Sequence, residues 1–335
     1  MLNIKLISIL IISNFLLVSY YSKISRFINI YDKPDYKRKI HKYKTPLLGG
    51  LIFFVNLVIY IFLLAINYIP IENIFFNNKD EFIFFILVAF VLFIIGLYDD
   101  KKQLSPNIKL LSVLFCILSL MMFNEEILIT EVHFSFINKV IHLGNFSYFF
   151  TGLCFLLFIN ACNMFDGINL QSSTFFLVCV LFQYFITGGN NFILFLILPL
   201  ISIIILNSTG KIFIGDGGIY LFSFIIGYLF IKLYNHRIII NSDTIFLIMM
   251  LPGFDLLRLF IERIYKKKHP FSPDKFHIHH LLYNKYDYFK TQLSLFFMII
   301  LPIFLSVFIF KPINIIVGTL IFYIILILFL RKDNN

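Results

Sequence analysis

The amino-acid sequence predicts an all-α, polytopic membrane protein with about eleven transmembrane helices, ten being the alternative count. Of its 335 residues, 60% are apolar and only 14% are charged, whereas an ordinary soluble domain has about 25% charged residues. This apolar content would supply around ten helices of about 20 residues each. Basic residues also collect in every second connection between apolar segments. We therefore expect one compact transmembrane domain over residues 1–335.

Each apolar segment is long enough to form one membrane-spanning helix. The first has no small-residue cleavage pattern and is expected to be a retained helix rather than a signal peptide. The turns at Gly188–Gly189 and Lys311–Pro312 are so tight that a merged or broken helix is the alternative there. Pro252–Gly253 should bend or break the ninth segment. In chain order the segments are residues 2–21, 48–68, 82–98, 106–123, 147–162, 169–187, 191–208, 217–234, 243–260, 292–310 and 312–330.

The distribution of Lys and Arg predicts the orientation in the membrane. Of the 28 such residues, 22 lie in or beside the segments that follow odd-numbered helices, and 6 lie on the other side. Because cytoplasmic loops carry the excess of positive charge, we expect the N-terminus outside and the C-terminus in the cytoplasm. The cytoplasmic loops are then residues 21–47, 99–105, 163–168, 209–216 and 261–291.

The net charge of +10 is explained by this topology, so no nucleic-acid partner is expected. The cysteines all lie in apolar runs without a C-x-x-C pair, which favours small membrane-interior side chains over a disulfide or a zinc site. They are Cys116, Cys154, Cys162 and Cys179.

Two adjacent carboxylates, Asp99 and Asp100, close the third predicted helix, and Lys109 follows in the next one. Neighbouring carboxylates repel one another, and a divalent metal or a bound cation is the usual way to keep both ionised. The alternative interpretation is a helix stop at the membrane interface.

Asn160 and Asn163 are spaced to share one helix face as the fifth helix leaves the membrane, and Asp166–Gly167 follow directly. An unpaired polar group in an apolar environment costs about 2 kcal/mol or more. These side chains should therefore bond each other, face water or hold a ligand. The alternative interpretation is that these side chains form hydrogen bonds that hold neighbouring helices together.

The run Gly215–Gly218 has the sequence Gly-Asp-Gly-Gly, in which glycines would let the backbone approach an anion or a metal while Asp216 supplies a hard oxygen ligand. An ordinary turn is the alternative. In the longest basic loop His277, His279 and His280 occur within four residues. No cysteine accompanies them, so phosphate binding is favoured over a zinc site.

Asp255 and Arg258 lie three residues apart in the ninth helix and are interpreted as a structural ion pair. The other polar motifs all fall on the face that the Lys and Arg count makes cytoplasmic. Their convergence predicts a magnesium-dependent site for a phosphorylated substrate at the cytoplasmic interface.

These motifs resemble those of the polyprenyl-phosphate N-acetylhexosamine-1-phosphate transferases, the membrane family that includes the WecA-type and MraY-type enzymes. The resemblance covers most of the chain in the family order. The residues that carry it are Asp32, Pro34, Arg38, Lys39, His41, Pro46, Gly49, Gly50, Asp99, Asp100, Leu104, Ser105, Pro106, Lys109, Asn160, Asn163, Asp166, Gly167, Gly215, Asp216, Pro273, Asp274, Lys275, His277, Ile278, His279 and His280.

The His-Ile-His-His run is similar to the WecA-type branch, since the MraY-type branch is expected to show three consecutive histidines. The resemblance implies transfer of N-acetylhexosamine-1-phosphate, most simply GlcNAc-1-phosphate, from a UDP-sugar to undecaprenyl or another polyprenyl phosphate. UMP is released, and the product is the first lipid-linked intermediate of a surface glycan such as lipopolysaccharide O-antigen or capsule. The implied location is the bacterial cytoplasmic membrane, with a homodimer as one assembly.

The resemblance and the chemistry together imply roles for the site residues. Asp216 and Asn163 would hold Mg²⁺, with Mn²⁺ as an alternative ion. Asp99 and Asp100 would lie near the lipid phosphate, where one of them, preferably Asp99, accepts its proton or orients it. Asp166 would orient the nucleotide-sugar.

The remaining residues would bind substrate. Lys109, Asn160 and the three histidines are expected to contact phosphate oxygens, with the cationic side chains neutralising them. The first basic loop, which contains Arg38, Lys39 and His41, is either structural or in contact with anionic headgroups.

Three positions depart from the family pattern. Leu170 follows Asn169 where a glycine is usual, Ile219 replaces a common serine, and Lys275 replaces an arginine and loses its bidentate fork. No metal ligand or titrating carboxylate is removed. An MraY-type phospho-MurNAc-pentapeptide transferase, a polytopic transporter and an inactive scaffold are the alternative functions.

Overall fold

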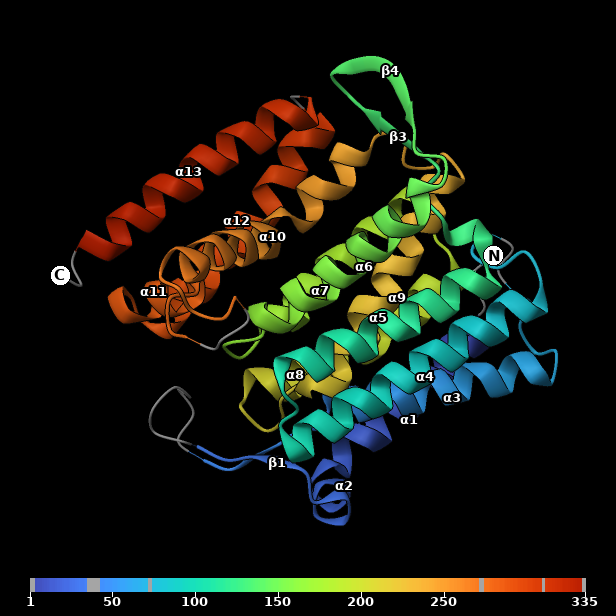
Figure 1. Ribbon diagram of the computed structural model, residues 1–335. Coiled ribbons are helices and arrows are strands. Elements are labelled where there is room, and N and C mark those ends of the chain that lie inside the picture. The colour runs from blue at the N-terminus through green and yellow to red at the C-terminus, as the bar shows by residue number, and fades with distance from the viewer. Residues whose placement is uncertain (1–3, 35–42, 72–73, 271–273, 309–310, 333–335) are drawn as a thin grey trace.

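The computed structural model describes residues 4–34, 43–71, 74–270, 274–308 and 311–332. Long helices lie side by side and two short β-hairpins project from the ends of this bundle (Figure 1). The helices are α1 (Ile4–Ser19), α2 (Tyr21–Ile28), α3 (Gly49–Ala65), α4 (Lys79–Lys102), α5 (Pro106–Phe123), α6 (Phe146–Phe165), α7 (Gln171–Ile186), α8 (Asn191–Ser208), α9 (Gly215–Asn235), α10 (Ser242–Tyr265), α11 (Ile278–Lys285), α12 (Tyr288–Phe308) and α13 (Pro312–Lys332), with a 3₁₀ turn, η1, at Glu125–Ile127. The hairpins pair β1 (Tyr31–Asp32) with β2 (Thr45–Pro46), and β3 (Glu131–Phe134) with β4 (Ile137–His142).

The all-α prediction is confirmed, and each of the eleven apolar segments contains a helix. Among the described residues, eight helices are long and apolar enough to cross a membrane, or nine if the bent pair α1 and α2 forms one span. The apolar helices α3 and α7 are shorter than these. The chain is thus a multi-pass membrane protein, while eleven spans and the sidedness stay predictions.

Helix α9 forms the centre of the bundle. Every residue from Gly217 to Tyr234 is buried, and α3, α4, α6 and α7 pack around it. The peripheral helices α12 and α13 instead expose many large apolar side chains, as expected for helices whose outer face contacts lipid. Burial of α9 on all sides explains why its sequence is apolar all round rather than amphipathic.

Helices α4 and α9 run antiparallel and are joined at both ends. At one end the Glu81 carboxylate accepts hydrogen bonds from Lys232 Nζ at 2.8 Å and from the Tyr228 hydroxyl at 2.6 Å. At the other end the Asp100 carboxylate accepts backbone N–H groups of α9, from Asp216 at 2.8 Å and from Gly217. Polar contacts at both ends fix the register between the two helices.

Several local expectations can be compared with the structure. Helix α10 continues through Pro252, so the broken-helix alternative is wrong there. The turn at Gly188–Gly189 separates α7 from α8, with both glycines at positive φ, and Pro312 starts α13 as a helix of its own. The β3–β4 hairpin and α11 were both expected as loop; the hairpin carries alternating apolar and polar residues but no short turn signal such as Asn-Gly.

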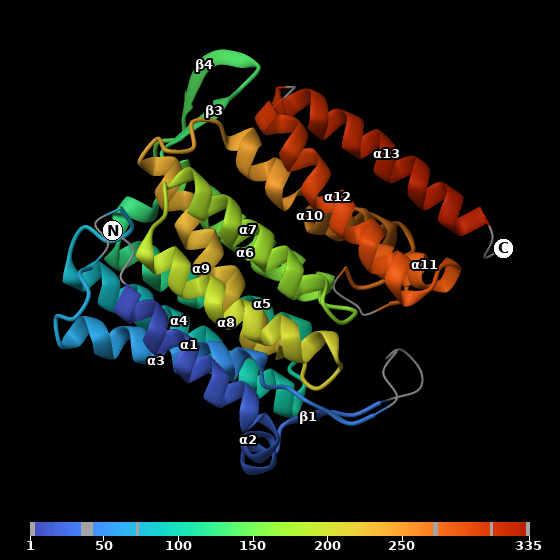
Figure 2. The ribbon, with the colours of Figure 1, turned by 180° about the vertical axis from the view of Figure 1, so that it is seen from behind.

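Helices α1 and α13 begin and end at opposite ends of the bundle. Helix α1 begins at the end from which the β3–β4 hairpin projects, whereas α13 ends near α11, at the end that also holds α2 and β1 (Figures 1 and 2). The side of the membrane on which each end lies stays a prediction.

Candidate active site

Four of the predicted site residues meet where α4, α5 and α9 converge. Asp99 and Asp100 occupy the last turn of α4, Lys109 lies in the first turns of α5, and Asp216 lies in the first turn of α9. Lys109 Nζ forms an ion pair with Asp99 and lies 3.5 Å from an oxygen of Asp216. We call Asp99, Asp100, Lys109 and Asp216 the acidic cluster. With three carboxylates and one ammonium, this half-buried site has an excess of negative charge.

Asp100 caps the N-terminus of α9. The residue before this helix, Ile214, has no side-chain acceptor for the free N–H groups of the first turn. The Asp100 carboxylate supplies both acceptors from the neighbouring helix, where its negative charge also faces the positive end of the helix dipole. Asp100 therefore holds the position of Asp216 whatever else it does in the reaction.

The glycines around Asp216 let helices approach one another. A Cβ atom on Gly96 of α4 would lie 2.5 Å from the backbone of Gly217, and one on Gly50 of α3 would overlap the backbone of Gly218. Gly215 adopts φ +76°, which favours glycine. The glycines thus permit close packing of α3, α4 and α9, and the approach of the Gly215–Gly218 backbone to an anion or a metal stays a prediction.

The first loop reaches the same place. Strands β1 and β2 pair antiparallel, and the chain then runs beside residue Phe213, whose carbonyl accepts the N–H of Gly49 at 3.0 Å. The N–H of Phe213 in turn donates to the carbonyl of Pro46 at 2.9 Å. The predicted residues Arg38, Lys39 and His41 of this loop lie outside the described residues.

The end of α6 carries the asparagines as predicted. Asn160 and Asn163 both lie within the last two turns of α6, and Asn160 donates to the Leu156 carbonyl of its own helix at 2.7 Å. Asp166 follows at the C-cap and is half-buried. Burial, together with the negative charge of Asp32, raises the pKa of Asp166 to about 6. Its charge also interacts with that of Asp100, which places the α6–α7 turn beside the acidic cluster.

His277 is held by Asp255 of α10. One Asp255 oxygen lies 2.7 Å from His277 Nδ1, and the other accepts the N–H of Ile278 at the start of α11. The predicted pair with Arg258 is confirmed at 2.7 Å, and the Tyr323 hydroxyl of α13 donates to the same carboxylate at 2.8 Å. Asp255 thus fixes both the His277 ring and the beginning of α11.

His279 connects the histidine loop to the α6–α7 turn. Its ring is 1% exposed and packs so closely on Gly167 that a Cβ there would overlap Nε2. Nδ1 of the same ring lies 3.3 Å from the Gln171 amide, while Nε2 has no hydrogen-bond partner among the described residues. The sequence motif at 166–167 therefore needs glycine because an aromatic ring lies against its backbone.

Two of the histidines are neutral at neutral pH. Burial holds the pKa of His279 well below its usual range, and burial together with the charge of His277 lowers the pKa of His280 to about 4. A neutral imidazole can donate one hydrogen bond to a phosphate but cannot neutralise its charge. Lys109 is the cation that lies within the acidic cluster, and the contact of the histidines with phosphate oxygens stays a prediction.

The Gly167→Ala substitution is expected to destabilise the protein by about 1–3 kcal/mol, because the added methyl group overlaps the His279 ring. The measurement is the midpoint of heat-induced unfolding of the purified protein in detergent. In a His279→Ala background the same substitution should cost much less, since the two sites are in contact. Equal costs in the two backgrounds would contradict the packing of His279 on Gly167.

Leu170, where the family usually has glycine, has a backbone conformation that favours glycine. It adopts φ +68°, the left-handed conformation that favours glycine, and Asn207 of α8 accepts its backbone N–H at 2.6 Å. The next carbonyl upstream, that of Asn169, accepts the Tyr288 hydroxyl at 3.2 Å. Contacts to α8 and α12 hold this turn in a conformation that leucine disfavours.

We expect Leu170→Gly to keep the protein folded and Leu170→Val to melt at a lower temperature. A left-handed conformation costs a residue with Cβ about 1–2 kcal/mol, and β-branching makes it worse. Equal melting temperatures of the two purified variants would show that this backbone conformation carries no strain.

The structure also shows the surroundings of the other two residues that depart from the family pattern. Ile219 is completely buried in α9, and Lys275 is exposed. The guanidinium groups beside His277 come instead from α10, where Arg258 binds Asp255 and Arg263 Nη2 lies 3.4 Å from His277 Nε2. The sequence signal for Arg263 was its place in the basic loop, whereas Tyr323 lies in an apolar helix without any signal.

The donors around Asp216 suit Mg²⁺ bound together with a phosphorylated substrate. Among the described residues, no group of three or more His, Cys, Asp or Glu side chains forms a closed metal cage. Mg²⁺ is usually held by one or two carboxylates plus substrate phosphates and keeps several waters. The half-buried Asp216, with the Asp99 and Asp100 carboxylates beside it, provides hard oxygen donors of this kind, so the site fits the ion. Asn163, on the last turns of α6, is a further half-buried amide oxygen donor.

Comparisons with known proteins agree with the motifs. Residues 82–234, which run from α4 to α9 and contain the acidic cluster and the α6–α7 turn, match the family model described as Glycosyl transferase family 4. The undecaprenyl-phosphate alpha-N-acetylglucosaminyl 1-phosphate transferase of Salmonella typhi is 29% identical over 278 residues, or 78% of this chain and 71% of that protein. The proteins with the same name from Escherichia coli K12 and Yersinia pestis are 26% identical (84% of this chain, 77% of that protein) and 29% identical (78% and 71%).

The family match covers the helices that build the acidic cluster, and the matched relatives extend over most of the chain. The resemblance to polyprenyl-phosphate N-acetylhexosamine-1-phosphate transferases of the WecA type is thereby confirmed.

Proposed function

We propose that this protein transfers GlcNAc-1-phosphate from UDP-GlcNAc to undecaprenyl phosphate and releases UMP. An oxygen of the lipid phosphate forms a bond to the sugar-bearing phosphorus, and the bond from that phosphorus to the bridging oxygen of UMP breaks. One diphosphate is exchanged for another, so the reaction is readily reversible. The names of the matched relatives support this substrate pair.

The observation that carries the proposal is the acidic cluster at the head of α9, at an end of the bundle rather than at mid-membrane. A phosphoryl transfer between two anionic substrates requires charge neutralisation and alignment more than covalent chemistry. Lys109, between Asp99 and Asp216, is positioned to contact a phosphate oxygen while both carboxylates hold it.

Asp99 is suited to orient Lys109. It is 2% exposed and accepts the Leu104 N–H at 2.8 Å in addition to its ion pair with Lys109. A phosphate monoester with a second pKa near about 6 is largely dianionic at pH 7, so its oxygen needs no strong base. We therefore favour a role in which Asp99 orients Lys109 toward the lipid phosphate over one in which Asp99 accepts a proton from that phosphate.

Asp216 and Asn163 would hold the magnesium ion, and Asp166 would orient the nucleotide-sugar. When bound, Mg²⁺ supplies charge neutralisation at the diphosphate. The neutral His279 and His280 would donate hydrogen bonds to phosphate or sugar oxygens, and Asn160 would line the same face of α6.

The test uses membranes that carry this protein, undecaprenyl phosphate, Mg²⁺ and a panel of donors: UDP-GlcNAc, UDP-GalNAc and UDP-MurNAc-pentapeptide. The expected result is UMP release with formation of a lipid-linked sugar from UDP-GlcNAc, abolished by a chelator and restored by Mg²⁺. Product from UDP-MurNAc-pentapeptide alone would support the MraY-type alternative. If folded protein forms no product with any donor, the proposed transferase activity is overturned. A transporter or an inactive scaffold would then be the remaining function.

The proposed site lies on the cytoplasmic face of the bacterial inner membrane. The excess of Lys and Arg at the end of the bundle that holds α2 and α11 supports this orientation. A homodimer would leave each acidic cluster complete, because all of its residues come from one chain.

A further inference from the structure

Helix α2 leaves the line of α1 at an angle of 67° beside the end of the bundle that holds the acidic cluster (Figure 1). Its inner side is packed on the protein, with Ser25 buried and Ile24 and Ile28 partly buried. Its outer side carries Lys23, Arg26 and Phe27. Phe27 is 92% exposed, which is unusual for a large apolar side chain next to two cations.

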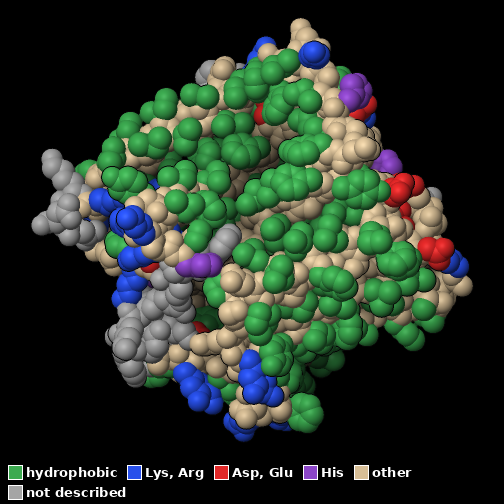
Figure 3. Space-filling view, in the orientation of Figure 1, with side chains coloured by type: hydrophobic (Ala, Val, Ile, Leu, Met, Phe, Trp, Pro, Cys, Tyr) green, Lys and Arg blue, Asp and Glu red, His purple; other side chains and the backbone are tan. Residues whose placement is uncertain are grey.

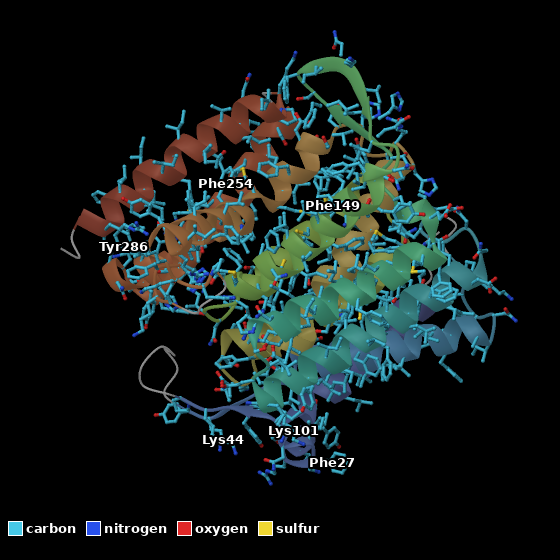
Figure 4. The ribbon with its side chains drawn as sticks, viewed as in Figure 1. Phe27, Lys44, Lys101, Phe149, Phe254 and Tyr286 are labelled. Atoms are coloured by element: carbon cyan, nitrogen blue, oxygen red, sulfur yellow. The ribbon has the colours of Figure 1, made fainter. Side chains whose placement is uncertain are left out.

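Further exposed cations lie at the same end of the molecule. Lys101 and Lys102 follow Asp99 and Asp100 directly at the end of α4, and Lys44 follows the first loop. Figure 4 shows Phe27, Lys44 and Lys101 at this end of the molecule, and Figure 3 shows basic side chains gathered there. Lys211 is connected to α2, since its ammonium lies 5.8 Å from the centre of the Tyr21 ring.

We call Lys23, Arg26, Phe27, Lys44, Lys101, Lys102 and Lys211 the basic interface patch. The ion pairs among the described residues include none of its six cations. The patch thus combines unneutralised positive charge with an exposed aromatic ring, the pattern of a helix that lies in the membrane interface.

The chemistry of the patch identifies its partner. An apolar side chain that is almost fully exposed gains free energy by entering the boundary between headgroups and acyl chains. Lys and Arg beside it attract anionic headgroups, each contributing about 1 kcal/mol near a charged membrane surface. Neither a protein surface nor water would favour both features on one short helix face as well as this boundary does.

We propose that α2 lies in the plane of the membrane interface and that the basic interface patch binds the phosphate groups of anionic phospholipids. This binding sets the depth of the acidic cluster, because Lys101 and Lys102 continue the chain from Asp99 and Asp100, and Lys211 precedes Gly215 by four residues. The acidic cluster is thereby held at the level where a lipid phosphate lies. The lipid binding itself does not depend on the proposed transferase reaction.

The absence of tryptophan from the sequence makes a direct test available. In the full-length Phe27→Trp variant, the introduced side chain is the single tryptophan, and it reports on the surroundings of α2. The protein is reconstituted in two preparations of vesicles that contain equal amounts of phosphatidylcholine and phosphatidylglycerol. In one preparation the phosphatidylcholine carries bromine on its acyl chains, and in the other the phosphatidylglycerol does. We expect blue-shifted emission, strongest quenching by bromine near the glycerol end of the chains, and more quenching by phosphatidylglycerol than by phosphatidylcholine.

Removal of positive charge tests the contact with anionic headgroups separately from the depth of residue 27 in the membrane. In the Phe27→Trp background, Lys23→Gln with Arg26→Gln should lower the preference for phosphatidylglycerol by up to about 25-fold, because each cation contributes a factor of about five. The matched control is Lys79→Gln with Lys139→Gln, two exposed cations outside the patch, and it should leave the preference unchanged.

Emission at the wavelength of tryptophan in water, with no quenching by either lipid, would overturn the interfacial position of α2. Equal quenching by both lipids, or a preference that survives loss of Lys23 and Arg26, would overturn the headgroup contact. Because the readout is fluorescence and requires no turnover, its failure is distinguishable from failure of the proposed transferase activity.

Discussion

Membranes that carry the Asp216→Asn variant are expected to exchange UMP with the UDP-sugar at least about 100-fold more slowly than membranes with the parent protein. Asp216 lies 3.5 Å from Lys109 Nζ and is a proposed magnesium ligand. Removal of one preorganised electrostatic contributor typically costs a factor of 10²–10³. The measurement is the initial rate of isotope exchange between UMP and UDP-GlcNAc at saturating Mg²⁺.

The same variant should fold at least as well as the parent. Asp216 is surrounded by Asp99 and Asp100, so loss of one negative charge reduces repulsion among carboxylates that are partly shielded from water. The control is Asp80→Asn, at the exposed opposite end of α4, which should retain the parent rate. Parent-like exchange by Asp216→Asn would remove this residue from the mechanism.

Much of the site follows from local sequence and from the charge count. Asp99, Lys109 and Asp216 were assigned to one membrane face because basic residues mark the connections that contain them, and the structure brings them together. The pair of Asp255 and Arg258 was also predictable, since residues three apart on a helix are neighbours. These successes rest on rules that act over a few residues or on whole connections.

Contacts between distant elements could not be predicted in the same way. The partners of Asp255 at His277 and Tyr323 are 22 and 68 residues away. The carboxylate of Asp100 caps a helix that begins 115 positions later in the chain. No periodicity reports on such pairs, because they depend on which helices pack together.

The central position of α9 is another result of packing. Its sequence is as apolar as that of several peripheral helices, and only burial on all sides distinguishes it. Lys232 lies inside the predicted helix 217–234, but the sequence does not indicate its partner, and the structure shows it 1% exposed and paired with Glu81. The apolar pattern predicted the helices, whereas their order around the centre required the structure.

The Gly96→Ala substitution is expected to reduce exchange by about 100-fold and to lower the unfolding temperature. Its methyl group would lie 2.5 Å from the backbone of Asp216 and Gly217, and because this neighbour is backbone, α4 and α9 must separate. Displacement of reacting groups by about 1 Å can cost 10²-fold in rate, and overpacking typically costs about 1–3 kcal/mol. The matched control is Gly318→Ala in α13, where no atom lies within 4 Å of the added Cβ, so rate and stability should be retained. Parent-like exchange by Gly96→Ala would show that the spacing of α4 and α9 does not govern the acidic cluster.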